Sequence, residues 1–463
     1  MSAPAVRGRH VLVAGLGVSG IAAARAAAAA GATVLAHDTA PAAVERARVE
    51  LDGQVELIAD PVALLRDAPP DVVVASPGLA PGTPVLAAAA AAGVEIWSEQ
   101  ELAWRLLDGR TRLLAITGTN GKTTTTELLA ACLDVPAVGN IGQPLSALVD
   151  DPPPLAVAEL SSFQLHYTRT LRTTVGVVLN VADDHLDWHG DRAAYAAAKA
   201  RIWHGQRPDG GAGLRDREWA VSNLDDAGCR QLVATHPPPA GHAGFTLGPP
   251  PPDSVGIDDG VVVERITGAQ STPVVAVDAL GVRGRHNIAN VTAAVATAIT
   301  AGVAPAGLGH PLTAARVGAH RLEVVAERDG VAWINDSKAT NPHAAAAALQ
   351  SFESVLWIAG GLGKGVSFEP LAAELGDRVR LALTIGRSGP QLAVMTRAHG
   401  VETVEADDLA TAVTIAADRA RPGDVVLLAP ACASMDQFVN YADRGDRFRA
   451  LVAAATTGGR GDA

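Results

Sequence analysis

Short apolar runs alternate with apolar-periodic segments from one end of the chain to the other. In the first hundred residues this pattern predicts strands at 10–15, 33–37 and 71–75, and helices at 19–30 and 84–92. Strand–helix alternation is typical of a parallel sheet with helices on both faces. We therefore expect a Rossmann-like N-terminal domain over residues 1–98.

The middle of the chain repeats the rhythm after a linking helix at 99–107. Strands are predicted at 113–116, 135–140, 155–160, 175–180, 261–265 and 274–277, and a helix at 287–301. Residues 205–280 are proline-rich in places and hard to assign, and 305–316 is expected to be a hinge. We expect a central P-loop-type ATPase domain with a parallel sheet over residues 99–317.

The last third shows strand–helix alternation again. Strands are predicted at 331–335, 355–359, 381–385 and 425–429, and helices at 342–349 and 409–417. This indicates a C-terminal Rossmann-like α/β domain over residues 318–463. The expected fold is therefore α/β with three domains.

Composition narrows the class of protein. The net charge of −12 argues against a general nucleic-acid binder, and Cys132, Cys229 and Cys432 have no metal or disulfide spacing. No apolar run is long enough to span a membrane, and the first run leads into a glycine turn rather than a cleavage site. We expect a cytoplasmic protein that binds neither nucleic acid nor membrane.

The most specific motif is Thr-Gly-Thr-Asn-Gly-Lys-Thr-Thr, between a buried strand and a helix. Gly118 and Gly121 free the backbone to surround phosphate oxygens, Lys122 can reach the β- and γ-phosphates, and Thr123 can bind Mg²⁺. Ile116 stands where the general P-loop has its first glycine. The alternative is a glycine-rich turn with a chance Lys-Thr.

A second glycine motif, Gly15-x-Gly17-x-x-Gly20, follows the first strand, and Asp38 ends the second. This matches the dinucleotide fingerprint and by itself favours NAD. A nucleotide-sugar diphosphate would suit the same helix N-terminus. Ser76 follows the third strand in a turn. This turn either faces the same crevice or has only a structural role.

Further polar residues follow strands of the middle region. Glu159 closes one strand, where a Mg²⁺-binding acid or a plain strand end are equally good interpretations. His185 lies among three aspartates after the next strand, which suits a divalent ion and an acyl-phosphate site, with a solvated acidic turn as the alternative. Lys199, on a helix, is interpreted from its sequence as an ordinary exposed lysine.

Several motifs in order resemble the Mur ligase family. They are Gly-Thr-Asn-Gly-Lys-Thr at 118–123, Glu-Leu-Ser-Ser-Phe-Gln at 159–164, Arg-His-Asn-Ile-Ala-Asn at 285–290, Asn-Asp-Ser-Lys-Ala-Thr-Asn at 335–341, Gly-Gly-Leu-Gly-Lys-Gly at 360–365 and Ser-Met-Asp-Gln-Phe at 434–438. Within the family, three of these segments are similar to the members that add D-glutamate. The resemblance implies an ATP-dependent amide ligase of peptidoglycan precursor synthesis, which joins D-glutamate to UDP-N-acetylmuramoyl-L-alanine through an acyl phosphate.

The resemblance also implies the binding residues. The UDP-substrate positions are Val18, Ser19, Asp38, Thr39, Ser76, Asn140 and Ser161. The ATP positions are Gly118, Thr119, Asn120, Gly121, Lys122, Thr123, Thr124, Asn287, Asn290, His320, Arg321, Asp336 and Lys338. The D-glutamate positions are Thr340, Lys364, Ser434, Met435 and Tyr441.

Two Mg²⁺ ions are implied, one at Thr123 and Glu159 and the other at His185. Lys199 matches the lysine that relatives carbamylate with CO₂ and use as a metal ligand, so the implied catalytic residues are Lys122, His185 and Lys199. The family resemblance also favours a monomer. One departure is Ala40, where relatives can have an arginine.

Other classes explain less of the chain. A dinucleotide-dependent oxidoreductase leaves the P-loop without a role, and a regulatory NTPase leaves the third domain without one. The alternative within the class is a sibling Mur ligase, or a folylpolyglutamate-type ligase, that adds another amino acid. A diamino-acid ligase would be expected to have an Asp-Asn-Pro-Arg-like segment in the third domain, and the sequence has none.

Overall fold

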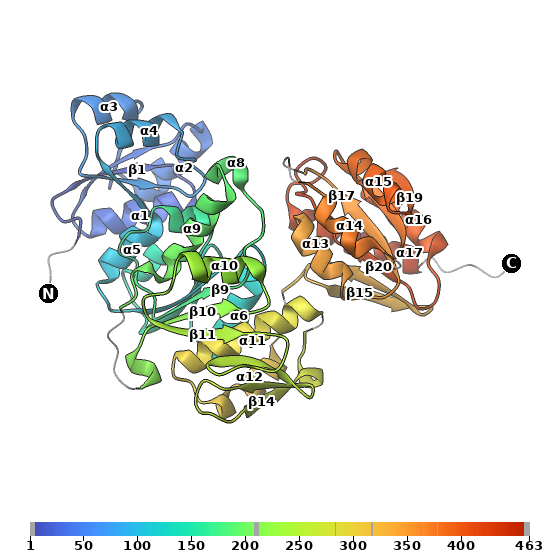
Figure 1. The fold of residues 1–463 in the computed structure, drawn as a ribbon. Helices are drawn as coiled ribbons and strands as arrows, with labels where there is room; N and C mark the ends of the chain where they lie inside the picture. Colours follow the sequence, from blue (N-terminus) through green and yellow to red (C-terminus); the bar gives the residue numbers. More distant parts are fainter. Residues whose placement is uncertain are drawn as a thin grey trace. The chain divides into compact units, whose positions relative to one another are not determined.

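The computed structural model describes residues 5–207, 213–282, 284–315, 318–363, 365, 367–376 and 378–457. These residues form two compact units, Met1–Ala279 with Ala289–Ala315, and Leu280–Ile288 with Arg316–Ala463. The first unit contains two sheets and the second contains one (Figure 1).

The N-terminal sheet has strand order β3-β2-β1-β4-β5 and all its pairs are parallel. Its strands are β1 His10–Ala14, β2 Thr33–His37, β3 Glu56–Leu57, β4 Val72–Ala75 and β5 Glu95–Ser98. Helices α1 Val18–Ala29, α2 Pro41–Leu51 and α5 Glu99–Leu107 pack on one face, and α3 Pro61–Asp67 and α4 Pro84–Ala91 on the other (Figure 1). Strands β2 and β3 are added on one side of β1, and β4 and β5 on the other. The strand order therefore reverses beside β1, and ligands bind at such a switch point in open α/β sheets. The Rossmann-like prediction is confirmed.

The central sheet has the order β14-β13-β12-β11-β10-β9-β6-β8-β7. Its strands are β6 Arg112–Thr117, β7 Ala137–Gly139, β8 Leu155–Glu159, β9 Val175–Val178, β10 Trp219–Asn223, β11 Gly241–Phe245, β12 Ser254–Asp258, β13 Val261–Glu264 and β14 Thr272–Ala276. The pairs from β7 to β12 are parallel, whereas β13 pairs antiparallel with both β12 and β14. The predicted parallel sheet is confirmed from β7 to β12, and β13 and β14 extend it by antiparallel pairs that the sequence analysis did not predict.

Helices and 3-10 turns surround the central sheet. They are α6 Lys122–Leu133, α7 Ser162–His166, α8 Leu186–His189, α9 Arg192–His204, α10 Ala227–Thr235, α11 Arg285–Thr300, α12 Gly309–Ala314, η1 Leu145–Leu148, η2 Leu214–Asp216, η3 Val277–Ala279 and η4 Pro305–Gly307. The expected hinge at 305–316 contains η4 and α12, and the two compact units divide at its end, between Ala315 and Arg316, so the hinge stays a prediction. Leu308 and Leu312 are buried four positions apart, which gives this short helix an apolar side.

The C-terminal sheet has the order β15-β16-β20-β17-β18-β19. Its strands are β15 Glu323–Arg328, β16 Val331–Asn335, β17 Val355–Gly360, β18 Val379–Ile385, β19 Glu402–Asp407 and β20 Val425–Leu428. Helices α13 Pro342–Leu349, α14 Glu369–Leu375 and α15 Gly389–Ala398 cover one face, and α16 Leu409–Arg419 and α17 Tyr441–Thr457 cover the other (Figure 1). Only the β15–β16 pair is antiparallel among the pairs described here.

None of the helices in the described ranges combines the length and the apolar character that crossing a membrane requires.

Candidate functional site

The glycine turn after β1 is held by side chains from two neighbouring strand ends. Asp38 follows β2, and its carboxylate accepts from the backbone N–H groups of Leu16 (2.6 Å) and Ala40 (2.8 Å). Ser76 follows β4 and donates its hydroxyl to the carbonyl of Gly15 (2.8 Å). The structure thus brings Asp38 and Ser76 to the turn, where both brace the backbone.

The other predicted residues of this crevice lie at its rim. Val18 and Thr39 are exposed and Ser19 is half-buried. Gly20 is required for close packing, because a Cβ there would lie 1.9 Å from the Gly15 carbonyl oxygen. The exposed helix N-terminus above this packing is open to a diphosphate, while contacts from Val18, Ser19 and Thr39 stay predictions.

The predicted phosphate loop lies between β6 and α6. Gly121 adopts φ +83° immediately before the helix, and Asn180 fixes the loop by accepting from the Asn120 N–H (2.8 Å) and donating to its carbonyl (3.0 Å). The Lys122 ammonium donates to the carbonyls of Gly118 and Thr119, both at 2.9 Å. A lysine folded over such a loop is positioned to meet phosphate oxygens.

Two more predicted ATP residues come from α11. A Cβ on Gly121 would lie 2.4 Å from Oδ1 of Asn290, so the buried Asn290 packs directly against the loop. Asn287, one turn earlier in the same helix, is also buried. Thr119, Thr124 and Thr123 belong to the loop and the first turn of α6, and only Thr123 of the three is not buried.

Lys199 is buried, and the interpretation of it as an ordinary exposed lysine was wrong. Its ammonium donates to the Gly118 carbonyl at 2.9 Å, the same oxygen that Lys122 uses, and lies 4.4 Å from the centre of the Tyr195 ring. Burial, and then the charge of Lys122, lower the pKa of Lys199 well below its ordinary value. A positive charge on this buried lysine, beside that of Lys122, is therefore costly.

Tyr195 belongs to the same cluster, although the sequence did not assign it a role. Its buried hydroxyl lies 3.0 Å from the Thr119 hydroxyl, and burial raises the pKa of Tyr195. The only signal in the sequence is its spacing of one helical turn from Lys199.

Glu159 ends β8 opposite Ile116 of β6, directly beside the phosphate loop. Its side chain is buried, and Oε1 accepts from the Asn140 amide at 2.8 Å. Within the described residues no donor reaches the buried Oε2. An unpaired buried carboxylate oxygen next to a phosphate loop fits a divalent cation.

His185 has a left-handed backbone (φ 56°) at the start of α8, 3.6 Å from Asp184 and with its ring against Phe163. Over the described ranges, no group of three His, Cys, Asp or Glu side chains lies close enough to hold a metal ion by itself. Ser161 caps α7 by accepting from the Gln164 N–H at 3.2 Å, which is a structural role.

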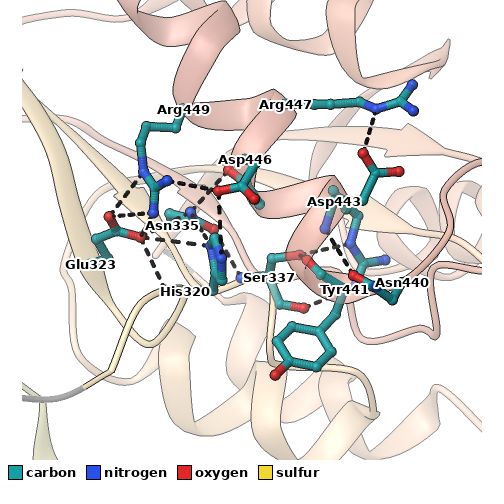
Figure 2. A network of polar contacts seen from close by, with 12 residues as sticks. His320, Glu323, Asn335, Ser337, Asn440, Tyr441, Asp443, Asp446, Arg447 and Arg449 are labelled. Carbon is teal, nitrogen blue, oxygen red and sulfur yellow. Dashed lines mark hydrogen bonds and ion pairs between the residues drawn. The ribbon is translucent and has the colours of Figure 1, made fainter.

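In the second unit, the predicted ATP residue His320 lies in a network of polar contacts (Figure 2). The Asn335 amide donates to His320 at 2.9 Å, and Glu323 and Asp446 lie 3.7 and 3.8 Å from the ring. Burial lowers the pKa of His320. The structure therefore gives this histidine protein partners, and a contact to ATP stays a prediction.

Asp336 and Lys338 follow β16, and Arg321 precedes β15. Asp336 is buried and accepts from the Leu322 N–H at 3.2 Å, and burial raises its pKa to about 7. The Lys338 ammonium lies 3.9 Å from the centre of the Tyr441 ring, so a predicted ATP residue touches a predicted D-glutamate residue.

The loop after β16 and the segment before α17 are joined by Arg444, which the sequence reasoning missed. This fully buried guanidinium donates to the Ser337 hydroxyl and carbonyl (3.0 and 2.9 Å) and to the Cys432 carbonyl (3.1 Å). Its burial could have been predicted from spacing, because Arg444 lies four and eight residues before the buried Phe448 and Val452 on the same face of α17.

The remaining predicted D-glutamate residues lie on these two segments. Thr340 follows Lys338, Ser434 is buried, and Met435 is 58% exposed. Lys364 lies outside the described residues.

Two glycine turns at strand ends, one of them with two lysines and a buried carboxylate beside it, are typical of α/β proteins that bind nucleotide phosphates. Family models match nearly the whole chain: the Mur ligase MurD-like N-terminal domain over 9–98, the Mur ligase middle domain over 116–298, and the Mur ligase glutamate ligase domain over 320–432. The chain belongs to the Mur ligase family.

Curated relatives cover the chain from end to end. Proteins named UDP-N-acetylmuramoylalanine--D-glutamate ligase are 46% identical in Frankia casuarinae (96% of this chain, 94% of the relative), 40% in Mycobacterium avium (98% and 98%) and 42% in Streptomyces avermitilis (96% and 98%).

Solved structures agree in fold. UDP-N-acetylmuramate-alanine ligase MurC from Thermotoga maritima is 17% identical with a TM-score of 0.55, over 96% of this chain and 99% of that one. A pseudomurein peptide ligase type C from Methanothermus fervidus is 16% identical with a TM-score of 0.56, over 96% and 100%.

Proposed function

We propose that this protein is an ATP-dependent ligase that adds D-glutamate to UDP-N-acetylmuramoyl-L-alanine in peptidoglycan precursor synthesis. The observation that carries the proposal is the end-to-end likeness to relatives of that name at 40–46% identity. The site around Gly118 supplies the chemistry that such a reaction needs.

The reaction must first make a carboxylate reactive. The terminal L-alanine carboxylate of the acceptor attacks the γ-phosphorus of ATP, ADP leaves, and an acyl phosphate forms. Lys122, already folded over the loop, neutralises charge on the phosphates. The free amine of D-glutamate then attacks the acyl carbon, phosphate leaves, and the amide loses a proton.

Mg²⁺ fits the residues around the loop. Among the described residues no donor reaches one buried oxygen of Glu159, Thr123 is partly exposed in the first turn of α6, and His185 follows the next strand. Bound Mg²⁺ would supply charge stabilisation between γ-phosphate and carboxylate. We assign one ion to Thr123 and Glu159 and a second to His185.

A carbamate on Lys199 is part of the proposal. A neutral lysine amine can attack CO₂, forming an N–C bond and releasing one proton, and the product is an anion. Lowering of the Lys199 pKa by burial and by Lys122 supports this, because it favours the uncharged amine that reacts, and the carbamate formed has a charge opposite to that of Lys122. The carbamate would then be available as a metal ligand.

We assign D-glutamate to the C-terminal unit, with Thr340 and Lys364 at one carboxylate and Ser434, Met435 and Tyr441 at the other. The proposed domain limits are 1–98, 99–317 and 318–463. A monomer in the cytoplasm, without nucleic-acid or membrane partners, is also proposed.

The test is phosphate release from ATP and Mg²⁺ with UDP-N-acetylmuramoyl-L-alanine and a panel of amino acids. We expect release with D-glutamate and none without the acceptor. Release with L-lysine or meso-diaminopimelate in place of D-glutamate would refute the specificity and favour a sibling ligase.

A further inference from the structure

A hollow of about 350 Å³ lies between the end of α9 and the loop that follows α7. It is lined by Thr168, Arg169, Leu171, Arg201 and His204. Three of these five side chains are basic and none is acidic, in a chain whose net charge is −12. None of the residues assigned above to ATP, acceptor or D-glutamate lines it.

Arg201 is the half-buried cation of this hollow. Its guanidinium donates to the Thr168 carbonyl at 2.9 Å, and no carboxylate of the described residues lies within 4.0 Å of it. Burial, and then Arg169, lower the pKa of Arg201. The helix dipole favours a cation such as Arg201 at the C-terminus of α9. It does not explain why a second cation, from the loop after α7, lies beside it.

Arg169 supplies the second charge. Its contact to Glu95 is long (3.5 Å), with both side chains about half exposed, so this ion pair contributes little. His204 supplies a third polar group, and burial, followed by Arg201 and His236, lowers the pKa of His204. Two arginines and an imidazole thus converge with little compensating negative charge.

The loop that contains Arg169 is held by hydrogen bonds to Glu101 of α5. The buried Glu101 carboxylate accepts from the N–H groups of Arg169 (2.8 Å), Thr170 (2.9 and 3.0 Å) and Leu171 (3.1 Å). Glu101 also accepts from Arg105 at 2.7 Å, so its charge is already matched. The hollow is therefore preorganised rather than a gap between mobile segments.

We propose that this hollow binds a phosphate-class oxyanion, held by the forked guanidinium groups of Arg169 and Arg201 with His204 beside them. Planar guanidinium groups match phosphate oxygens in pairs, and the volume admits a phosphate with a small attached group. The site goes beyond the proposed function and does not depend on which amino acid the enzyme adds.

The location gives such an anion a connection to the reaction centre. Lys199 lies two residues before Arg201 on α9 and donates to the Gly118 carbonyl of the phosphate loop. An anion bound to Arg201 therefore contacts the same helix that positions Lys199.

The test is calorimetric titration of the full chain with inorganic phosphate and, separately, with glycerol 3-phosphate. UDP, Mg²⁺ and a non-hydrolysable ATP analogue are kept saturating to fill the other phosphate sites, and ionic strength is fixed. We expect Arg169→Gln and Arg201→Gln each to weaken binding at least tenfold. Arg169→Gln leaves the Arg201–Thr168 and Glu101 backbone bonds in place, so it separates binding from folding.

Arg230→Gln is the matched control, because Arg230 also donates to a carbonyl (Leu224, 2.7 Å) but lies outside the hollow. Binding of phosphate alone would identify the free ion as ligand, and binding of the ester would identify a phosphorylated metabolite. No binding of either probe, or equal binding by a folded Arg169→Gln variant, would overturn the proposal.

Discussion

At the residue scale, the candidate site contains ionisable side chains that are buried next to the phosphate loop. Lys199 and Lys122 share one carbonyl oxygen, and one oxygen of Glu159 has no hydrogen-bond partner among the residues that the structure describes. Charges without partners are costly in a buried site. Their presence is best explained by bound ligands that would neutralise or coordinate them.

Lys199→Ala should lower activity by about 100-fold or more, the scale expected for losing one preorganised charge-stabilising group. A short-chain carboxylic acid in the buffer should restore part of it by replacing the carbamate. Steady-state phosphate release measures both effects, with the same concentration of sodium chloride as control. No restoration by any short acid would argue against carbamylation.

Glu99 predicts a pH dependence of stability. Burial raises the pKa of Glu99 to about 7, with the Ser146 N–H as one of its partners. The folded chain then keeps a proton that the unfolded chain loses near its ordinary pKa of 4.5, so the free energy of unfolding falls as pH rises between about 4.5 and 7.

Glu99→Gln should remove this component, so the variant should gain up to about 3 kcal/mol relative to the parent between the two ends of that window. Guanidinium unfolding at several pH values measures the difference. Parallel stability–pH curves for parent and variant would contradict it.

The sequence correctly predicted that Glu159 ends a strand and wrongly indicated that Lys199 is exposed, and the cause is local in both cases. Glu159 follows a fully apolar strand, so its position at a strand end was readable. Helix α9 has alanine on several sides, so its sequence gives little indication of which face is buried.

At the scale of elements, glycine positions decide how closely strands and helices approach. Gly20→Ala would place a methyl group 1.9 Å from the Gly15 carbonyl, which is backbone and cannot turn aside. Gly17 has nothing within 4 Å and ordinary φ of −70°.

Gly20→Ala should therefore destabilise the protein by about 2 kcal/mol, in the range for overpacking, while Gly17→Ala should stay close to the parent. Thermal unfolding followed by circular dichroism compares the two. Equal losses for both variants would refute the packing argument.

The element pattern was predicted where strands are apolar and helices long. Strands β10 to β12 were missed because, for example, β11 (Gly-His-Ala-Gly-Phe) contains two glycines and only one residue type that favours strands. Strands β13 and β14 were predicted, but their antiparallel pairing was not, because strand–helix alternation elsewhere in the domain favoured a parallel sheet.

At the scale of the whole molecule, three sheets each present polar residues where their strands end. The order of these sheets along the chain, with one glycine motif after the first strand and a second in the central domain, could be predicted from the sequence. Contacts such as Arg444 to Ser337, more than a hundred residues apart, could not, because no local pattern records them.

The most direct test of the central claim is the product itself. The full chain is incubated with ATP, Mg²⁺, UDP-N-acetylmuramoyl-L-alanine and D-glutamate, and the nucleotide product is analysed by mass spectrometry. The account predicts a single product heavier than the acceptor by one glutamate residue, formed only when ATP is present. An unchanged acceptor, despite ATP hydrolysis, would contradict it.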